Sequence, residues 1–96
     1  MKDILDDLNK AFENKVRLGI MSALVVSKQV DFNTLKDLLG VTDGNLASHL
    51  KSLESKEYIE VYKLFVGRKP KTNYKATSSG KKAFKKHIKA IEQLLK

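Results

Sequence analysis

The chain has 96 residues, enough for one domain (residues 1–96) with a single modest hydrophobic core. It contains no cysteine, which excludes disulfides and thiolate metal sites. No apolar run approaches the ~20 residues that span a bilayer. The N-terminal sequence MKDILDDLNK is acidic and lacks the long apolar core of a signal peptide. We therefore expect a soluble cytoplasmic protein.

The net charge of +8 is unevenly distributed along the chain. Residues 1–60 carry eight Lys/Arg and ten Asp/Glu, whereas residues 61–96 carry eleven Lys/Arg and one acid, Glu92. Positive charge gathered into one third of a chain favours a polyanionic partner. The alternative is a lysine-rich surface that serves only solubility.

Apolar spacing predicts two helices in the first third of the chain. The first covers residues 3–13, where Ile4, Leu5, Leu8 and Phe12 follow helical periodicity. The second covers residues 15–27 and has so many apolar positions that we expect it to be buried on more than one side.

A helix-turn-helix is predicted next. Asp31 or Asn33 caps a helix whose apolar stripe includes Phe32, Leu35, Leu38 and Leu39, and Gly40 occupies the position of a left-handed C-terminal cap. Thr42 then caps a second helix over residues 42–56. A helix, a glycine turn and a second helix form the motif that places its second helix in the major groove. Many such corners bind nothing, and that reading stays open.

The two faces of the helix at 42–56 differ in chemistry. Leu46, Leu50 and Leu53 share one stripe, while the opposite face is built mainly of glycine, serine and asparagine. Short polar side chains let a helix approach DNA closely and still offer hydrogen bonds to base edges. A serine-rich solvated helix is the competing interpretation. The candidate DNA contacts on this face are Thr42, Gly44, Asn45, Ser48, Lys51 and Ser52.

A β-hairpin with a basic tip is predicted over residues 58–76. Tyr58–Val66 is rich in β-branched and aromatic residues, and Thr72–Ala76 returns as a second strand. Between them, residues 67–71 form a turn in which Pro70 is expected to break any strand. Cations beside a groove-fitting helix make a phosphate or minor-groove clamp, although hairpin tips are often basic for solubility alone. The candidate contacts here are Arg68, Lys69, Lys71 and Thr72.

The last predicted helix, residues 78–95, is capped by Thr77 and has Gly80 in its first turn, where it allows close packing on the hairpin. Its apolar residues recur at spacings of four, three and four. Because a short chain has limited core to bury apolar stripes on both terminal helices, we expect these helices to form a homodimer. The candidate interface comprises Ile4, Leu5, Leu8, Phe12, Phe84, Ile88, Ile91 and Leu95.

Three stretches, KVRLGIMSAL, DFNTLKDLLGVTDGNLASHLKSLESKEYIEV and GRKPKTNYKATSSGKKAF, resemble the small winged-helix transcriptional regulators of the MarR and ArsR type. The likeness covers residues 14–84 and is greatest to the short MarR-like group. It implies a mostly α, α+β winged helix-turn-helix with a two-stranded wing and dimerising terminal helices. It also implies a homodimer that binds pseudo-palindromic double-stranded operator DNA as a repressor or autoregulator, with residues 42–56 as recognition helix and residues 67–72 as wing tip.

The sequence departs from parts of that family. Metal-sensing members use Cys or His clusters, whereas this chain has only His49 and His87. We expect a hydrogen-bonding or half-buried role for His49 and a dimer-interface or surface position for His87, and no metal or cofactor. No effector is specified by the residues.

Two other functions remain. A winged helix also serves as a protein–protein interaction module of the transcription machinery, in which the basic charge meets an acidic protein. A small enzyme is disfavoured, because there is no nucleophile–base pairing, glycine-rich phosphate loop or carboxylate pair in an apolar setting.

Overall fold

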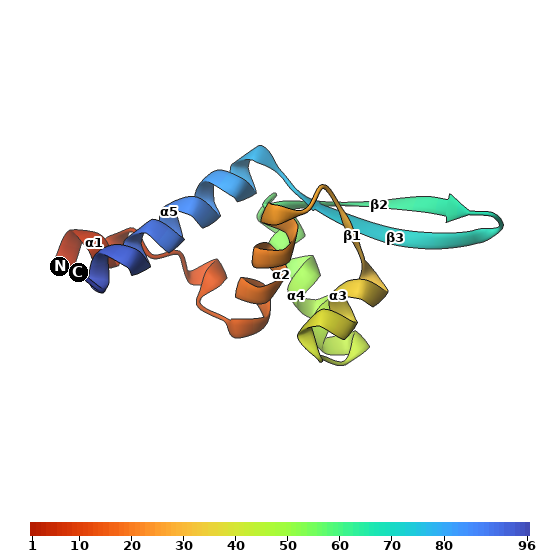
Figure 1. Cartoon of the computed structure of the whole chain (residues 1–96), viewed down its shortest axis with the longest axis horizontal. Coiled ribbons are helices and arrows are strands. Elements are labelled where there is room, and N and C mark those ends of the chain that lie inside the picture. The colour runs from red at the N-terminus through yellow and green to blue at the C-terminus, as the bar shows by residue number, and fades with distance from the viewer.

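The computed structural model describes residues 1–96 as five α-helices, one 3₁₀ turn and three strands (Figure 1). In chain order these are α1 (Lys2–Asp6), η1 (Lys10–Phe12), α2 (Lys15–Val26), β1 (Val30–Asp31), α3 (Phe32–Leu39), α4 (Asp43–Ser55), β2 (Ile59–Val66), β3 (Lys69–Ala76) and α5 (Ser78–Leu94). The mostly helical winged helix-turn-helix expected from the sequence is confirmed.

Helix α2 is the centre of the core, as its apolar pattern predicts. The Asn14 side chain caps it by accepting hydrogen bonds from the backbone N–H groups of Val16 and Arg17. Ile20, Met21 and Leu24 on this helix are completely buried. They belong to a cluster of 15 core residues that joins α2 to α4, the sheet and α5.

The expected continuous helix over residues 3–13 is wrong. α1 ends at Asp6, and Asn9 adopts an extended conformation with φ −110° and ψ 121°. The Asn9 side chain accepts a hydrogen bond from Ala11 N–H, while its own backbone N–H donates to His87 Nδ1 at 2.9 Å. These bonds give the backbone partners that a helix would otherwise supply, so the chain turns at Asn9.

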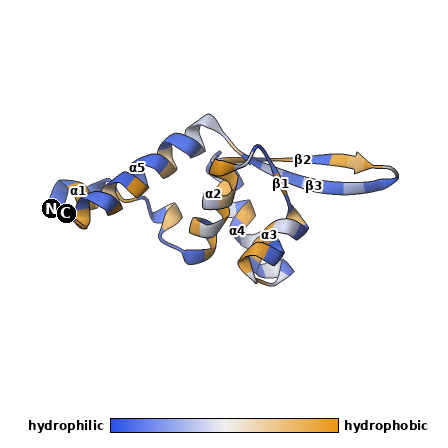
Figure 2. Ribbon diagram, viewed as in Figure 1, coloured by the Kyte–Doolittle hydropathy of each residue, from blue (hydrophilic) through white to orange (hydrophobic).

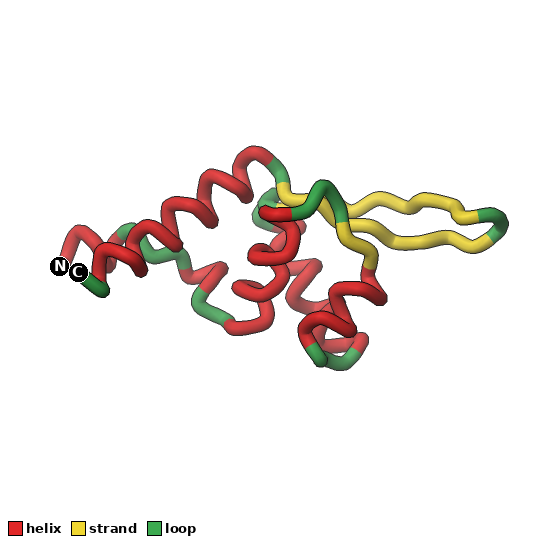
Figure 3. Tube along the Cα trace, viewed as in Figure 1, coloured by secondary structure: helices red, strands yellow, loops and turns green.

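The sheet has three strands in the order β1-β3-β2, one more than the predicted hairpin (Figure 3). Strand β1 contributes only two pairs, Val30 with Tyr74 and Asp31 with Asn73. Two residues are too few to show an alternating pattern in the sequence.

Pro70 does not end the strand, contrary to expectation. β3 begins at Lys69, and Pro70 pairs with Phe65 of β2. Since β1 reaches only Asn73, β3 has an open edge at Pro70, where a missing N–H leaves no partner unsatisfied.

The turn between α3 and α4 follows local sequence signals. Asp31 caps α3, Gly40 takes the left-handed conformation with φ 63°, and Thr42 Oγ1 caps α4 by accepting from Asn45 N–H. The predicted stripe on α3 is wrong at Leu38, which is 66% exposed, because only Leu35 is fully turned into the core.

Helix α5 begins at the predicted cap, where Thr77 Oγ1 accepts a hydrogen bond from Gly80 N–H. A Cβ at Gly80 would collide with the backbone carbonyl of Tyr58, so the glycine permits the expected close packing of α5 on the start of β2. From there α5 runs away from the hairpin, and both chain termini lie at the opposite end of the molecule from the hairpin tip (Figure 1). No helix has the length and apolar character needed to cross a membrane.

Candidate nucleic-acid interface

Helix α4 turns its leucines inward and its short polar side chains outward. Leu46 and Leu53 are fully buried and Leu50 is nearly so. On the opposite side, Asn45 and Ser48 are exposed and Ser52 is half-buried. The predicted face is thus formed by one helix and is most accessible at Asn45 and Ser48.

The start of α4 is open as well as exposed. A Cβ at Gly44 would meet no atom within 4 Å, so nothing inside the protein requires a glycine there. The Thr42 hydroxyl oxygen already accepts from Asn45 N–H, but its proton remains free to donate. This surface lets a ligand approach the helix backbone closely.

A cation that the sequence analysis did not identify lies beside Asp43. Lys36 Nζ is 2.8 Å from Asp43 Oδ1, and the Lys36 side chain is 40% exposed and that of Asp43 71%. The hydrogen bond from this ammonium to Asp43, together with the carboxylate charge, raises the pKa of Lys36. The ion pair offsets the negative charge of Asp43, which would otherwise oppose a phosphate at the helix start. Lys36 is on α3 and Asp43 is seven positions later, so helical periodicity does not relate them.

A second unpredicted residue, Arg17, holds α4 in place. Its Nε donates to the carbonyl oxygen of Ala11 at 2.7 Å, and its Nη1 lies 3.1 Å from His49 Nδ1. A guanidinium is only a donor, so His49 Nδ1 accepts and its proton is on Nε2. His49 is half-buried and hydrogen-bonded, as expected.

A tight turn at the C-terminal end of α4 leads into the hairpin. Glu57 has φ 61°, the only left-handed conformation outside glycine, and Tyr58 N–H donates to Leu53 O at 3.1 Å. This bond satisfies a carbonyl in the last turn of the helix. The turn fixes where β2 begins relative to α4.

The turn at the wing tip (residues 67–72) contains fewer residues than predicted. Val66 pairs with Lys69, so only Gly67 and Arg68 form the turn, with Gly67 at φ 66°. Arg68, Lys69 and Lys71 are exposed and Thr72 is half-buried. The hairpin projects from the side of the molecule where α3 and α4 lie (Figure 1).

Not every cation of the basic third of the chain is free. Lys75 Nζ is 3.5 Å from Glu60 Oε2 and 6.0 Å from the centre of the Tyr62 ring. By contrast, no ion pair involves Arg68, Lys69 or Lys71. Lys63 on β2 is unpaired as well, so three of the four unpaired cations of the hairpin lie at its tip.

The predicted dimer residues divide into two groups. Phe12 is 1% exposed and belongs to the protomer's own core, against Phe84 and Tyr58 with ring centres 5.3 Å apart, so its assignment to an interface is wrong. Phe84 is also buried in that core. The remaining residues keep apolar surface in solvent: Ile4, Leu8, Ile88 and Ile91 are half-buried, and Leu5 and Leu95 are exposed.

His87 occupies neither of the positions expected for it. It is 3% exposed, its ring packs on Phe12 at 5.5 Å, and its Nδ1 accepts from Asn9 N–H. Burial lowers the pKa of His87, partly opposed by the charge of Glu13. A buried imidazole kept neutral joins the N-terminal segment to α5.

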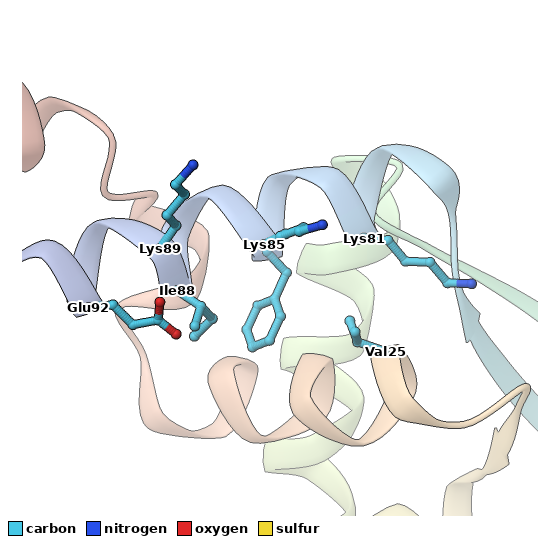
Figure 4. A pocket seen from close by; sticks show the side chains of 7 residues that line it. Val25, Lys81, Lys85, Ile88, Lys89 and Glu92 are labelled. Carbon is cyan, nitrogen blue, oxygen red and sulfur yellow. The ribbon is translucent and has the colours of Figure 1, made fainter.

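An open groove of about 550 Å³ runs between α2 and α5 (Figure 4). Its apolar lining is Val25, Phe84 and Ile88, with Lys81, Lys85, Lys89 and Glu92 around it. The three lysines recur every fourth residue and form one edge of the helix.

Comparisons with known proteins agree with this geometry. The family model described as winged helix DNA-binding domain matches residues 16–95. An uncharacterized protein of Methanocaldococcus jannaschii, MJ0432, is 41% identical over 87 residues, which are 91% of this chain and 95% of that protein.

Two solved structures are similar over nearly the whole chain. A transcriptional regulator homologue from Pyrococcus horikoshii OT3 has a TM-score of 0.89 and 28% identity, over 99% of this chain and 95% of that one. MepR of S. aureus, solved as a DNA complex, shares the fold with a TM-score of 0.79 and 20% identity, over 100% of this chain and 79% of that one. With its helix-turn-helix, wing and terminal helices, this chain belongs to the winged helix DNA-binding domain family.

Proposed function

We propose that the protein is a cytoplasmic homodimer that binds pseudo-palindromic double-stranded operator DNA and represses transcription. The observation that carries the proposal is the outer face of α4, which is exposed, built of short polar side chains and open at Gly44. A helix of this kind fits the major groove, which just admits an α-helix.

Within this proposal, Asn45, Ser48 and Ser52 reach base edges and Lys51 lies nearer the backbone. Thr42 and Gly44 bring the start of α4 to a phosphate, where free N–H groups attract anions. Each base-directed contact contributes ~1–3 kcal/mol of discrimination, the upper end being reached by bidentate contacts.

The wing acts on affinity more than on sequence choice. Arg68, Lys69 and Lys71 hold the phosphates of the flanking groove, and Thr72 adds a hydroxyl beside them. Phosphate contacts position a protein on DNA without reading its sequence.

The dimer is formed by the terminal helices. Leu5 is 51% exposed and Leu95 is 83% exposed, at the end of the molecule where α1 packs beside α5. These side chains supply the apolar surface for a second copy, and a two-fold axis there directs both α4 helices to one operator.

Selection of bound fragments from genomic DNA tests the proposal. We expect an inverted repeat with half-sites about one helical turn apart, and a complex with the mass of a dimer on one duplex. Asn45→Ala and Ser48→Ala should weaken binding to the selected duplex in a mobility-shift assay, whereas Ser79→Ala, exposed on α5, should not. If neither selected nor random duplexes shift, the chain is a protein-interaction module instead.

A further inference from the structure

The far end of the hairpin carries apolar side chains in addition to its cations. Phe65 is 70% exposed, Val66 63% and Leu64 41%. Pro70, opposite Phe65 on β3, is exposed too. We call Leu64, Phe65, Val66 and Pro70 the apolar wing patch. Orange residues at the end of β2 mark its larger part in Figure 2.

The strand register divides this patch between two faces. Phe65 pairs with Pro70, which gives one face a purely apolar end. On the other face Leu64 pairs with Lys71 and Val66 with Lys69, so each apolar side chain has a cation beside it. The apolar wing patch is thus an apolar wedge with positively charged side chains beside it.

Nothing within the chain covers this wedge. β1 pairs with β3 only at Asn73 and Tyr74, short of the patch. The terminal helices lie at the other end of a molecule 53 Å long, so a dimer formed there leaves the patch exposed as well. A wing that needed only to bind phosphate would gain nothing from a phenyl ring in water.

Charge complementarity identifies the occupant. The minor groove of DNA is about 6 Å wide, with phosphates along its rims and sugars and base edges within. An apolar wedge with lysines and an arginine around it matches that distribution. Apolar side chains placed against the minor groove separate neighbouring base pairs, most easily at flexible pyrimidine–purine steps.

The free length of the hairpin is similar to the distance between neighbouring grooves of DNA. Between the Lys63–Thr72 pair and the turn, the hairpin extends roughly 15 Å beyond the part flanked by β1. The minor groove next to a helix in the major groove lies about half a helical turn away, ~17 Å.

We infer that the apolar wing patch, with Phe65 as its largest side chain, enters the minor groove beside each half-site and selects flexible base steps there. This inference rests on the proposed function. It adds a specificity determinant outside α4, distinct from the phosphate contacts of Arg68 and Lys69.

The test repeats the genomic selection with the wild type, Phe65→Ala and Phe65→Leu. The wild type should enrich pyrimidine–purine steps at a fixed distance outside each half-site. Phe65→Ala should keep the half-site but lose the flanking preference, with binding to the wild-type site weakened about tenfold, within the range for losing one base-step contact. Phe65→Leu should retain most of the preference, because it keeps a large apolar side chain.

A fluorescent base analogue at the flanking step measures the separation of base pairs directly. Its emission should rise on binding of the wild type and not on binding of Phe65→Ala. Val26→Ala, which alters a side chain 85% exposed at the end of α2, is the matched control and should behave as wild type. A thermal melt establishes that each variant is folded.

The outcomes separate the two proposals. If the wild type selects no DNA, the proposed function fails and the wedge fails with it. If the wild type and Phe65→Ala select the same flanking sequence, the wedge is wrong while operator binding stands. A change of oligomeric state in Phe65→Ala with the flanking preference intact would assign the patch to contact between protein copies and also overturn the inference.

Discussion

At position 44 a glycine occupies the first turn of α4, although the structure leaves open space for a side chain. Gly80, in the first turn of α5, is the opposite case, since the Tyr58 carbonyl excludes any Cβ. Packing inside the protein therefore requires a glycine at position 80 but not at position 44. At Gly44 the reason is expected to be the close approach of DNA.

Gly44→Ala should raise the free energy of unfolding by about 0.5 kcal/mol, because alanine loses less backbone entropy on folding. The same substitution should weaken operator binding, since the methyl group stands between helix and phosphate. Urea unfolding and mobility shift measure the two effects. Gly80→Ala is the control and should lower stability. Unchanged affinity in Gly44→Ala would show that the start of α4 stays away from DNA.

Glu57 holds a left-handed conformation with φ 61° at the end of α4, a conformation that costs a residue with a side chain about 1 kcal/mol. Glu57→Gly should therefore increase the free energy of unfolding by up to about 1 kcal/mol. The hydrogen bond from Thr77 Oγ1 to Glu57 O involves the backbone and is kept. Lys56→Gly, at φ −88°, lacks this strain and should destabilise. Chemical unfolding of the two variants decides the point.

At the scale of elements, the hairpin separates functions along its length. Its base is part of the core through Ile59, Tyr74 and Ala76, and its tip holds three exposed cations that form no ion pair. Substitutions at the tip should therefore change binding without changing stability.

Arg68→Ala combined with Lys69→Ala should weaken binding to selected and random duplexes alike. The slope of log K against log salt should become shallower by roughly two units, about one for each lost phosphate contact. Lys75→Ala is a matched control on the same strand, because Lys75 is already paired with Glu60. A double variant with the wild-type salt slope would argue against phosphate contacts by the wing.

At the scale of the whole molecule, two projecting elements give the fold an elongated shape. The radius of gyration is 14.3 Å, above the ~12.5 Å of a compact domain of this length. The hairpin extends at one end, and α1 with α5 at the other (Figure 1). The junction at the second end is held by the Asn9–His87 hydrogen bond, with Asp7 and Lys86 3.7 Å apart nearby.

His87 should make stability depend on pH. Its pKa is lowered in the folded state from the ordinary 6.5, so below about pH 6.5 the unfolded chain takes up the proton first. The contribution of neutral His87 to the free energy of unfolding is fully present above that pH and decreases as the pH falls. The decrease levels off once His87 is protonated in the folded protein too. The melting temperature should thus drop more between pH 7.5 and 5 in the wild type than in His87→Asn, which retains an acceptor for Asn9 N–H. Equal pH dependence in both would show that His87 does not control the junction.

The sequence by itself determined the features that depend on neighbours along the chain. Thr42 and Thr77 cap helices because a hydroxyl reaches an N–H three residues away, and Gly40 ends α3 because it accepts a positive φ. The leucines of α4 share a face because of helical periodicity alone. The short polar face opposite them, and the concentration of charge after residue 60, were equally visible.

Only the tertiary structure decided features that depend on distant residues. The break at Asn9 involves His87, 78 positions later, and the placement of Pro70 depends on where β1 stops. Phe12 and Ile4 belong to the same predicted apolar stripe, yet Phe12 is buried in the core and Ile4 is only half-buried. Periodicity shows which side chains are apolar on one face, but what covers that face is settled by the elements that pack there.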